Sequence, residues 1–131
     1  MSAELVEWAL ALMLAFAPPG RSLIRDAVET PEAGRARYAE IAAATVEAAD
    51  GNKRAVSLLL SISFHESAWR RDVDFGIGPV SRGDKGRSCT IFQFNLGPGK
   101  RCDDLIADRR LAAADALKLA RRSFAACRAL P

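Results

Sequence analysis

The chain has 131 residues, half of them apolar and 27% charged, the composition of one globular domain that buries its own core. The formal net charge is +3, yet residues 53–101 hold nine Lys or Arg against four Asp or Glu, a local charge of +5. This basic middle suits an anionic partner such as nucleic acid, teichoic acid or cell wall, or else consists of solvated arginines at helix ends.

Three cysteines, Cys89, Cys102 and Cys127, occur without CxxC spacing, which argues against a zinc site. One disulfide with a free thiol and three reduced thiols are both compatible with this number. We expect no metal and no cofactor.

An apolar run near the start ends in AFA at 15–17, a small-residue pattern that resembles a signal-peptide cleavage site. The segment before the run has no Lys or Arg and carries Glu4 and Glu7, and the run itself is too short to span a bilayer. We interpret it as a core helix that Ser2 caps and that stops before Pro18. Neither a signal peptide nor a transmembrane segment is therefore predicted.

Helix-start signals divide the following part of the chain. A short helix is predicted at 22–29, and Thr30 with the proline and glutamate after it predicts the start of a longer helix that ends at Gly51. Asn52 caps the next helix, at about 53–69.

The second half begins with an irregular segment, because residues 72–100 contain six glycines and two prolines. Long loops in compact domains usually carry function. A short helix from Asp103 and a final amphipathic helix that Asp108 caps complete the chain. We predict one domain, all-α or mainly α with a short β-hairpin, made of N-terminal helices (1–52), a central helix and loop (53–100) and C-terminal helices (101–131).

Glu66 is the unusual residue of the central helix, because it continues the apolar face formed by Ala55, Leu59 and Ile62. Burial beside Ile62 and Trp69, and the negative end of the helix dipole, would favour its protonated form. A carboxylic acid held protonated near neutral pH can act as a general acid. The alternative is a buried Glu66 that a nearby arginine neutralises: Arg70, Arg71, Arg82 or Arg87.

The stretch GDKGRSCTIFQFNLG, residues 83–97, supplies Asp84, Gln93 and Asn95. On an extended segment Gln93 and Asn95 point to the same side, where two amides can bind sugar hydroxyl and N-acetyl groups, and Asp84 can position a water. The alternative is ordinary turn polarity. The alternating apolar residues are then expected to face the core: Phe92, Phe94 and Leu96.

A helix that ends in HESAW, followed by GDKGRS and then TIFQFN, resembles the lysozyme-like superfamily, which includes lytic transglycosylases and goose-type lysozymes. The resemblance implies a lysozyme-like domain in which Glu66 is the catalytic general acid. It also implies that Gln93 lines the substrate site and that Ser67 orients Glu66 or an N-acetyl group. His65 is about 100° around the helix from Glu66, so we interpret it as a groove-wall or structural residue.

Asp84 lies in a G-D-x-G element similar to the one with which goose-type lysozymes hold the attacking water. The sequence departs from that pattern at Asn95, where a second aspartate is expected, and at Thr90, where glycine is usual. With Asp84 as base the enzyme would be an inverting muramidase, with carboxyl groups about 6.5–9.5 Å apart. With Glu66 alone it would be a lytic transglycosylase that forms an anhydro sugar.

The resemblance thus implies cleavage of peptidoglycan at the β-1,4 bond between N-acetylmuramic acid and N-acetylglucosamine. The alternative is a catalytically weak lysozyme-like module that binds glycan or builds a virion. A nucleic-acid-binding domain ranks last, because the chain lacks an aromatic stacking array, and no nucleic-acid partner is expected. A wall-cutting enzyme without a signal peptide fits a phage endolysin or a protein associated with a phage virion or tail.

Overall fold

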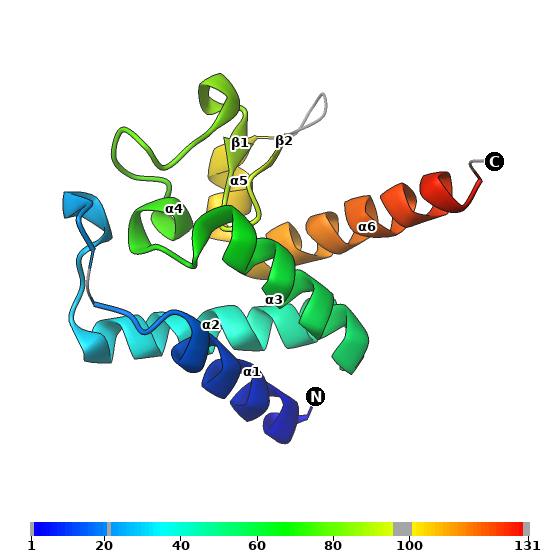
Figure 1. The fold of residues 1–131 in the computed structure, drawn as a ribbon, viewed down its shortest axis with the longest axis horizontal. Helices are drawn as coiled ribbons and strands as arrows, with labels where there is room; N and C mark the ends of the chain where they lie inside the picture. Colours follow the sequence, from blue (N-terminus) through cyan, green and yellow to red (C-terminus); the bar gives the residue numbers. More distant parts are fainter. Residues whose placement is uncertain (1, 21, 96–100, 130–131) are drawn as a thin grey trace.

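The computed structural model describes residues 2–20, 22–95 and 101–129. In that part of the chain, helices surround a core and carry one short two-stranded antiparallel sheet, so the predicted mainly α class with a hairpin is confirmed (Figure 1). The elements are α1 (Ala3–Phe16), η1 (Arg25–Ala27), α2 (Pro31–Ala48), α3 (Lys53–Ser67), α4 (Arg71–Phe75), η2 (Asp84–Gly86), β1 (Ser88–Cys89), β2 (Phe94–Asn95), α5 (Cys102–Ala107) and α6 (Arg109–Arg128).

The four long helices begin where the sequence predicts. Each starts after a side-chain oxygen that accepts a hydrogen bond from the backbone N–H three residues further on, at 3.0 to 3.2 Å. Such a cap satisfies one of the amides that a helix start leaves without an intrahelical partner. The capping residues are Ser2, Thr30, Asn52 and Asp108.

Three predicted boundaries were wrong. The helix expected at 22–29 is only the single 3-10 turn η1, in which the carbonyl of Asp26 accepts a hydrogen bond from Arg71 instead of continuing a helix. The central helix ends at Ser67 and not at 69. The irregular segment begins later than predicted, because α4 occupies its first residues.

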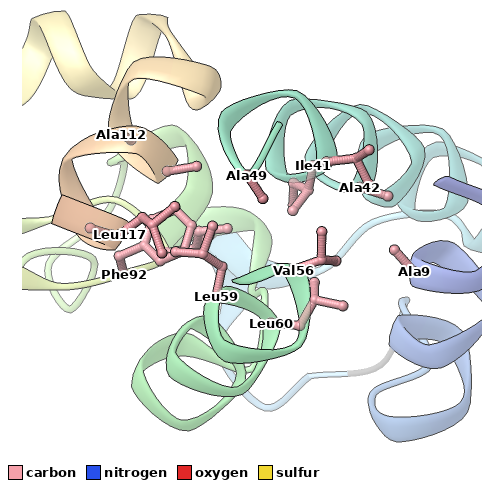
Figure 2. Close-up of a cluster of buried hydrophobic side chains, with 14 of the residues drawn as sticks. Ala9, Ile41, Ala42, Ala49, Val56, Leu59, Leu60, Phe92, Ala112 and Leu117 are labelled. Carbon is pink, nitrogen blue, oxygen red and sulfur yellow. The ribbon is translucent and has the colours of Figure 1, made fainter. Parts of the chain in front are cut away.

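The core lies between α2, α3 and α6, with α1 against one end of it. Figure 2 shows Ile41 of α2 and Ala49, the residue directly after that helix, facing Val56 and Leu59 of α3. Ala9 of α1 closes the core on one side, and the other side is closed by Phe92 and Leu117. The hairpin is therefore anchored to the helical core by the residue that precedes Gln93.

A buried ion cluster ties the helices together beside this core. Arg37 of α2 donates to Glu29 at 2.7 and 3.0 Å and to Asp74 of α4 at 3.2 Å. Asp74 also accepts two hydrogen bonds from Arg109 of α6, at 2.7 and 3.0 Å, and Arg109 pairs with Glu40 at 2.9 Å. The hydrogen bonds that Arg109 donates to Asp74 raise the pKa of the Arg109 guanidinium above its ordinary value.

A disulfide between Cys89 and Cys102 joins β1 to α5. Cys127, near the end of α6, is an exposed free thiol. Of the two alternatives that the sequence left open, the structure has one disulfide with one free cysteine. No helix in the described ranges is long and apolar enough to cross a membrane.

Candidate active site

Glu66 lies in the last turn of α3 and is exposed, so the predicted burial of this carboxylate was wrong. Ala55 and Leu59 on the same helix face are buried and Ile62 is half-buried, so the apolar face leaves the core one turn before Glu66. In Figure 1 this end of α3 lies toward α4 and the hairpin.

The carboxylate of Glu66 has no hydrogen-bond or ion-pair partner among the described residues. Three arginines that could have neutralised it have other partners. Arg70 pairs with Asp72 at 3.1 Å, Arg71 donates to a backbone carbonyl of η1, and Arg82 pairs with Asp103 at 3.2 Å. The alternative of a buried, arginine-paired Glu66 is therefore wrong as well.

The chain reverses sharply directly after the helix. Ala68 and Trp69 both have left-handed backbone conformations, with φ of 49° and 55°. Such conformations cost a residue with a Cβ about 1–2 kcal/mol each and persist only where other contacts hold them. The reversal turns the Trp69 ring into the core, where it is 2% exposed, and thereby takes it away from the helix face that Glu66 occupies.

Contacts of both its ring and its backbone carbonyl hold Trp69 in place. Its indole N–H donates to the hydroxyl of Ser63 at 2.7 Å, and its ring packs edge-on against Tyr38 with centroids 5.8 Å apart. Its carbonyl accepts a hydrogen bond from the buried Arg37 guanidinium at 2.7 Å. The ion cluster thus fixes the backbone three residues after Glu66.

Ser67 is buried and serves the helix end. Its hydroxyl donates to the carbonyl of Ser63 at 2.8 Å and accepts from the backbone N–H of Trp69 at 3.2 Å. It therefore supports the reversal after Glu66, and the predicted contact between Ser67 and substrate does not fit its position.

The loop brings Asp84 and Asn95 together. The side-chain amide of Asn95, on β2, donates to a carboxylate oxygen of Asp84 at 2.6 Å, and both residues are exposed. Asp84 begins η2 with a left-handed φ of 55°. The second carboxylate oxygen of Asp84 has no hydrogen bond to any described residue and can accept one from a water or a sugar.

Gln93 holds the loop from inside. Its amide nitrogen donates to the carbonyls of Thr90 at 2.8 Å and Ser81 at 3.1 Å, and its oxygen accepts from the backbone N–H of Gly83 at 3.1 Å. Gln93 and Asn95 thus both reach the 83–84 segment. The amide of Gln93 is occupied by backbone groups, so it shapes the site and is not free to bind a sugar.

The apolar residues of the stretch anchor it. Phe92 is buried and Phe94 is half-buried against the core, whereas the expectation for Leu96 lies outside the described residues. Thr90, where the resemblance expects glycine, has a φ of 63°, in the region that favours glycine. Its hydroxyl accepts from the backbone N–H of Phe92 at 3.2 Å, which helps to hold this conformation.

His65 is exposed and lines a groove of about 320 Å³ between α1 and α3, with Trp8, Phe16 and Phe64 among the other lining residues. Glu66 is not among the residues that line this groove.

Two structural roles near the site were not predicted from the sequence: the contacts that hold Trp69 in the core and the hydrogen bonds by which Gln93 holds the loop. Their partners are backbone groups or distant residues, which no local sequence pattern identifies.

Within the described ranges, no group of three or more His, Cys, Asp or Glu side chains is arranged to hold a metal ion. Comparison of the chain with models of protein families, with curated proteins and with solved structures found no match.

Proposed function

We propose that this protein cleaves the glycan strand of peptidoglycan at the β-1,4 bond between N-acetylmuramic acid and N-acetylglucosamine, with Glu66 as the general acid. The observation that carries the proposal is the state of Glu66, an exposed carboxylate that no described residue pairs with, at a helix end that several buried contacts fix. The order of the sequence motifs HESAW, GDKGRS and TIFQFN, similar to that of lysozyme-like enzymes, supplies the substrate class.

In this mechanism Glu66 gives its proton to the glycosidic oxygen while the bond from that oxygen to the sugar C1 breaks. A glycan bound over the helix end would exclude water from this step and strengthen the hydrogen bond between the carboxyl group and the glycosidic oxygen.

Asp84 is the proposed base. Its free oxygen would take a proton from a water as that water attacks C1, and inversion of the anomeric centre would follow. Asn95 fixes the other carboxylate oxygen of Asp84 at 2.6 Å, so it acts as a positioning residue. An aspartate at position 95 could not donate this hydrogen bond when ionised, which gives the departure from the expected pattern a physical reason.

A second candidate function is a glycan-binding or structural module, including a virion component, that cleaves weakly. The observation in its favour is that Ser67 and Gln93, two residues expected to contact substrate, are occupied by internal hydrogen bonds.

The test is clearance of purified sacculi by wild type and by Glu66→Gln. We expect the variant to clear them 10²- to 10⁴-fold more slowly, roughly the contribution of a general acid, and to keep its circular dichroism spectrum. Glu7→Gln, at an exposed position of α1, is the matched control and should clear at the wild-type rate. Clearance by Glu66→Gln at the control rate would exclude Glu66 as the acid.

Asp84→Asn separates the two reaction types. If Asp84 is the base, this variant should also lose activity, whereas a transglycosylase that uses Glu66 alone should be little affected. If wild type binds sacculi but releases no soluble fragments, the second candidate function is the correct one.

A further inference from the structure

The last part of α6 concentrates positive charge. Lys118, Arg121, Arg122 and Arg128 lie within residues 116–129, a stretch without Asp or Glu. All four are exposed, and Figure 1 shows this end of α6 extending beyond the other helices. The neighbouring Asp115 is the single acidic residue of the whole helix, so α6 is a strongly basic element in a chain of net charge +3.

Three of these cations line one groove. A hollow of about 380 Å³ lies where the end of α2 meets α6, and Lys118, Arg121 and Arg122 form its charged wall. No acidic side chain is among the described residues that line it. The remaining lining residues are small or apolar: Ala48, Ala114, Leu117 and Ala125.

The spacing of the cations requires explanation. Lys118, Arg121 and Arg122 are three and four residues apart, so they share one helix face, where like charges repel and destabilise the helix. Glu47 directly precedes Ala48, the α2 residue that lines the groove, and its carboxylate lies 3.9 Å from the guanidinium of Arg110. A helix face that gathers three cations around a hollow is suited to an anionic ligand.

The groove distinguishes between classes of anion. A membrane-surface helix presents an exposed apolar face between its cations, but the apolar face of α6 packs on the core through Ala113 and Leu117. Beyond this contact with the core, Leu119 and Phe124 of α6 are 44% and 53% exposed. The hollow lies between two helices, which suits a thin polymer chain better than a flat bilayer surface, and the described groove residues include no aromatic ring on which nucleic-acid bases could stack.

We propose that this groove binds a linear phosphodiester polymer through its phosphates alone, of the kind that is attached to bacterial cell walls. The assignment of the polymer to the wall rests on the function proposed above. The basic end of α6 then holds the enzyme on the wall, while cleavage occurs at the last turn of α3, which carries Glu66, and at the hairpin.

The test is the affinity for purified poly(glycerol phosphate), measured by fluorescence anisotropy between 25 and about 300 mM salt, the range in which phosphate contacts weaken steeply. All proteins carry Glu66→Gln, so binding is measured without cleavage. The groove variant is Lys118→Gln with Arg121→Gln and Arg122→Gln, since glutamine keeps a comparable helix propensity. The control removes equal charge from other exposed positions, by Arg25→Gln, Arg35→Gln and Arg54→Gln.

We expect the groove variant to bind at least about 10-fold more weakly at low salt, with a slope of log affinity against log salt smaller by about 2, at roughly 0.7 per phosphate contact. The control should lose much less. Equal losses in both variants, or no binding by the parent protein, would overturn the proposal. Tighter binding to a single-stranded DNA than to poly(glycerol phosphate) at the same salt would replace it with nucleic-acid binding.

The outcomes for groove and active site are separable. If sacculi are cleaved normally but binding does not depend on the groove, only the present inference fails. If binding depends on the groove but wild type does not cleave sacculi, the function proposed for Glu66 fails and the anion site remains.

Discussion

Ala68 has a left-handed backbone at an exposed position immediately after the helix that carries Glu66, and nothing in its methyl group compensates for this conformation. We expect Ala68→Gly to stabilise the fold by about 0.5–1 kcal/mol, because glycine adopts a positive φ without steric cost. Ala36→Gly, at an exposed interior position of α2, should destabilise by a similar amount. Urea unfolding measures both, and a loss of stability in Ala68→Gly would contradict the left-handed turn.

Tyr38 is the single tyrosine of the chain, and burial raises its pKa to about 12 from an ordinary 10.0, partly opposed by the charge of Arg37. Its hydroxyl donates to the carbonyl of Ala17 at 2.6 Å, which favours the protonated phenol. Because the folded protein holds this proton more tightly than the unfolded chain, the related stability is complete below pH 10. It is lost as the pH rises toward 12, by up to about 2–3 kcal/mol.

Tyrosinate absorbance near 295 nm should therefore appear about two pH units later in the folded protein than in urea. Tyr38→Phe, which cannot titrate, should show a shallower loss of stability between pH 10 and 12. An ordinary titration midpoint in the folded protein would show that the phenol is not buried.

Single residues also mark the limit of what the sequence could predict. The helical wheel correctly grouped Ala55 and Leu59 on a buried face, because that face depends only on the helix period. It failed for Glu66 because the wheel assumes that the helix continues, whereas the reversal at Ala68 and Trp69 ends it. That reversal depends on Arg37, which is 32 residues away in sequence, so no local pattern could have indicated it.

Among the elements, the starts of the long helices were predictable and their ends less so. An N-cap such as Asn52 acts on an amide three residues away, within the range of local sequence patterns. The short helix α4 was missed because its five residues are held by tertiary contacts, above all the two arginines on Asp74. The hairpin was one of two predicted alternatives for the glycine-rich segment, but the pairing of Cys89 with Cys102 was not predicted, since three cysteines permit three pairings.

The disulfide links the loop of the candidate site to α5, with 13 residues of separation between its cysteines. We expect Cys89→Ala with Cys102→Ala to lower the free energy of unfolding by about 3 kcal/mol, because the open chain gains entropy when unfolded. Cys127→Ser, at an exposed free thiol, should change it by less than about 0.5 kcal/mol. Urea unfolding with and without reductant measures both, and equal stability of the double variant and wild type would refute the contribution of the bond.

At the scale of the whole molecule, Asp74 joins α2, α4 and α6 through two arginines and is 4% exposed. We expect Asp74→Asn to destabilise by about 3–5 kcal/mol, because it leaves the buried guanidinium of Arg37 with one carboxylate partner fewer and weakens the hold on Arg109. Asp103→Asn removes an exposed partner of Arg82 and should cost less than about 1 kcal/mol. Comparable values for the two variants in urea unfolding would mean that the buried cluster does not organise the fold.

This cluster connects stability with the candidate site, since Arg37 also fixes the carbonyl of Trp69 behind Glu66. The chain composition predicted one mainly helical domain, because apolar content and helix-start signals are properties of the sequence itself. The ion cluster, by contrast, joins Asp74 to Arg109, 35 residues away in sequence, and to Arg37, 37 residues away. It forms only when the helices pack.

The most direct test of the central claim is mass spectrometry of the soluble products released from purified sacculi. We expect wild type to release muropeptides cut between N-acetylmuramic acid and N-acetylglucosamine, with reducing ends if Asp84 activates a water. Anhydro ends, lighter by one water, would instead indicate transglycosylation by Glu66 alone. Glu66→Gln should release none. The absence of glycan fragments from wild type, or identical fragments from Glu66→Gln, would contradict the account.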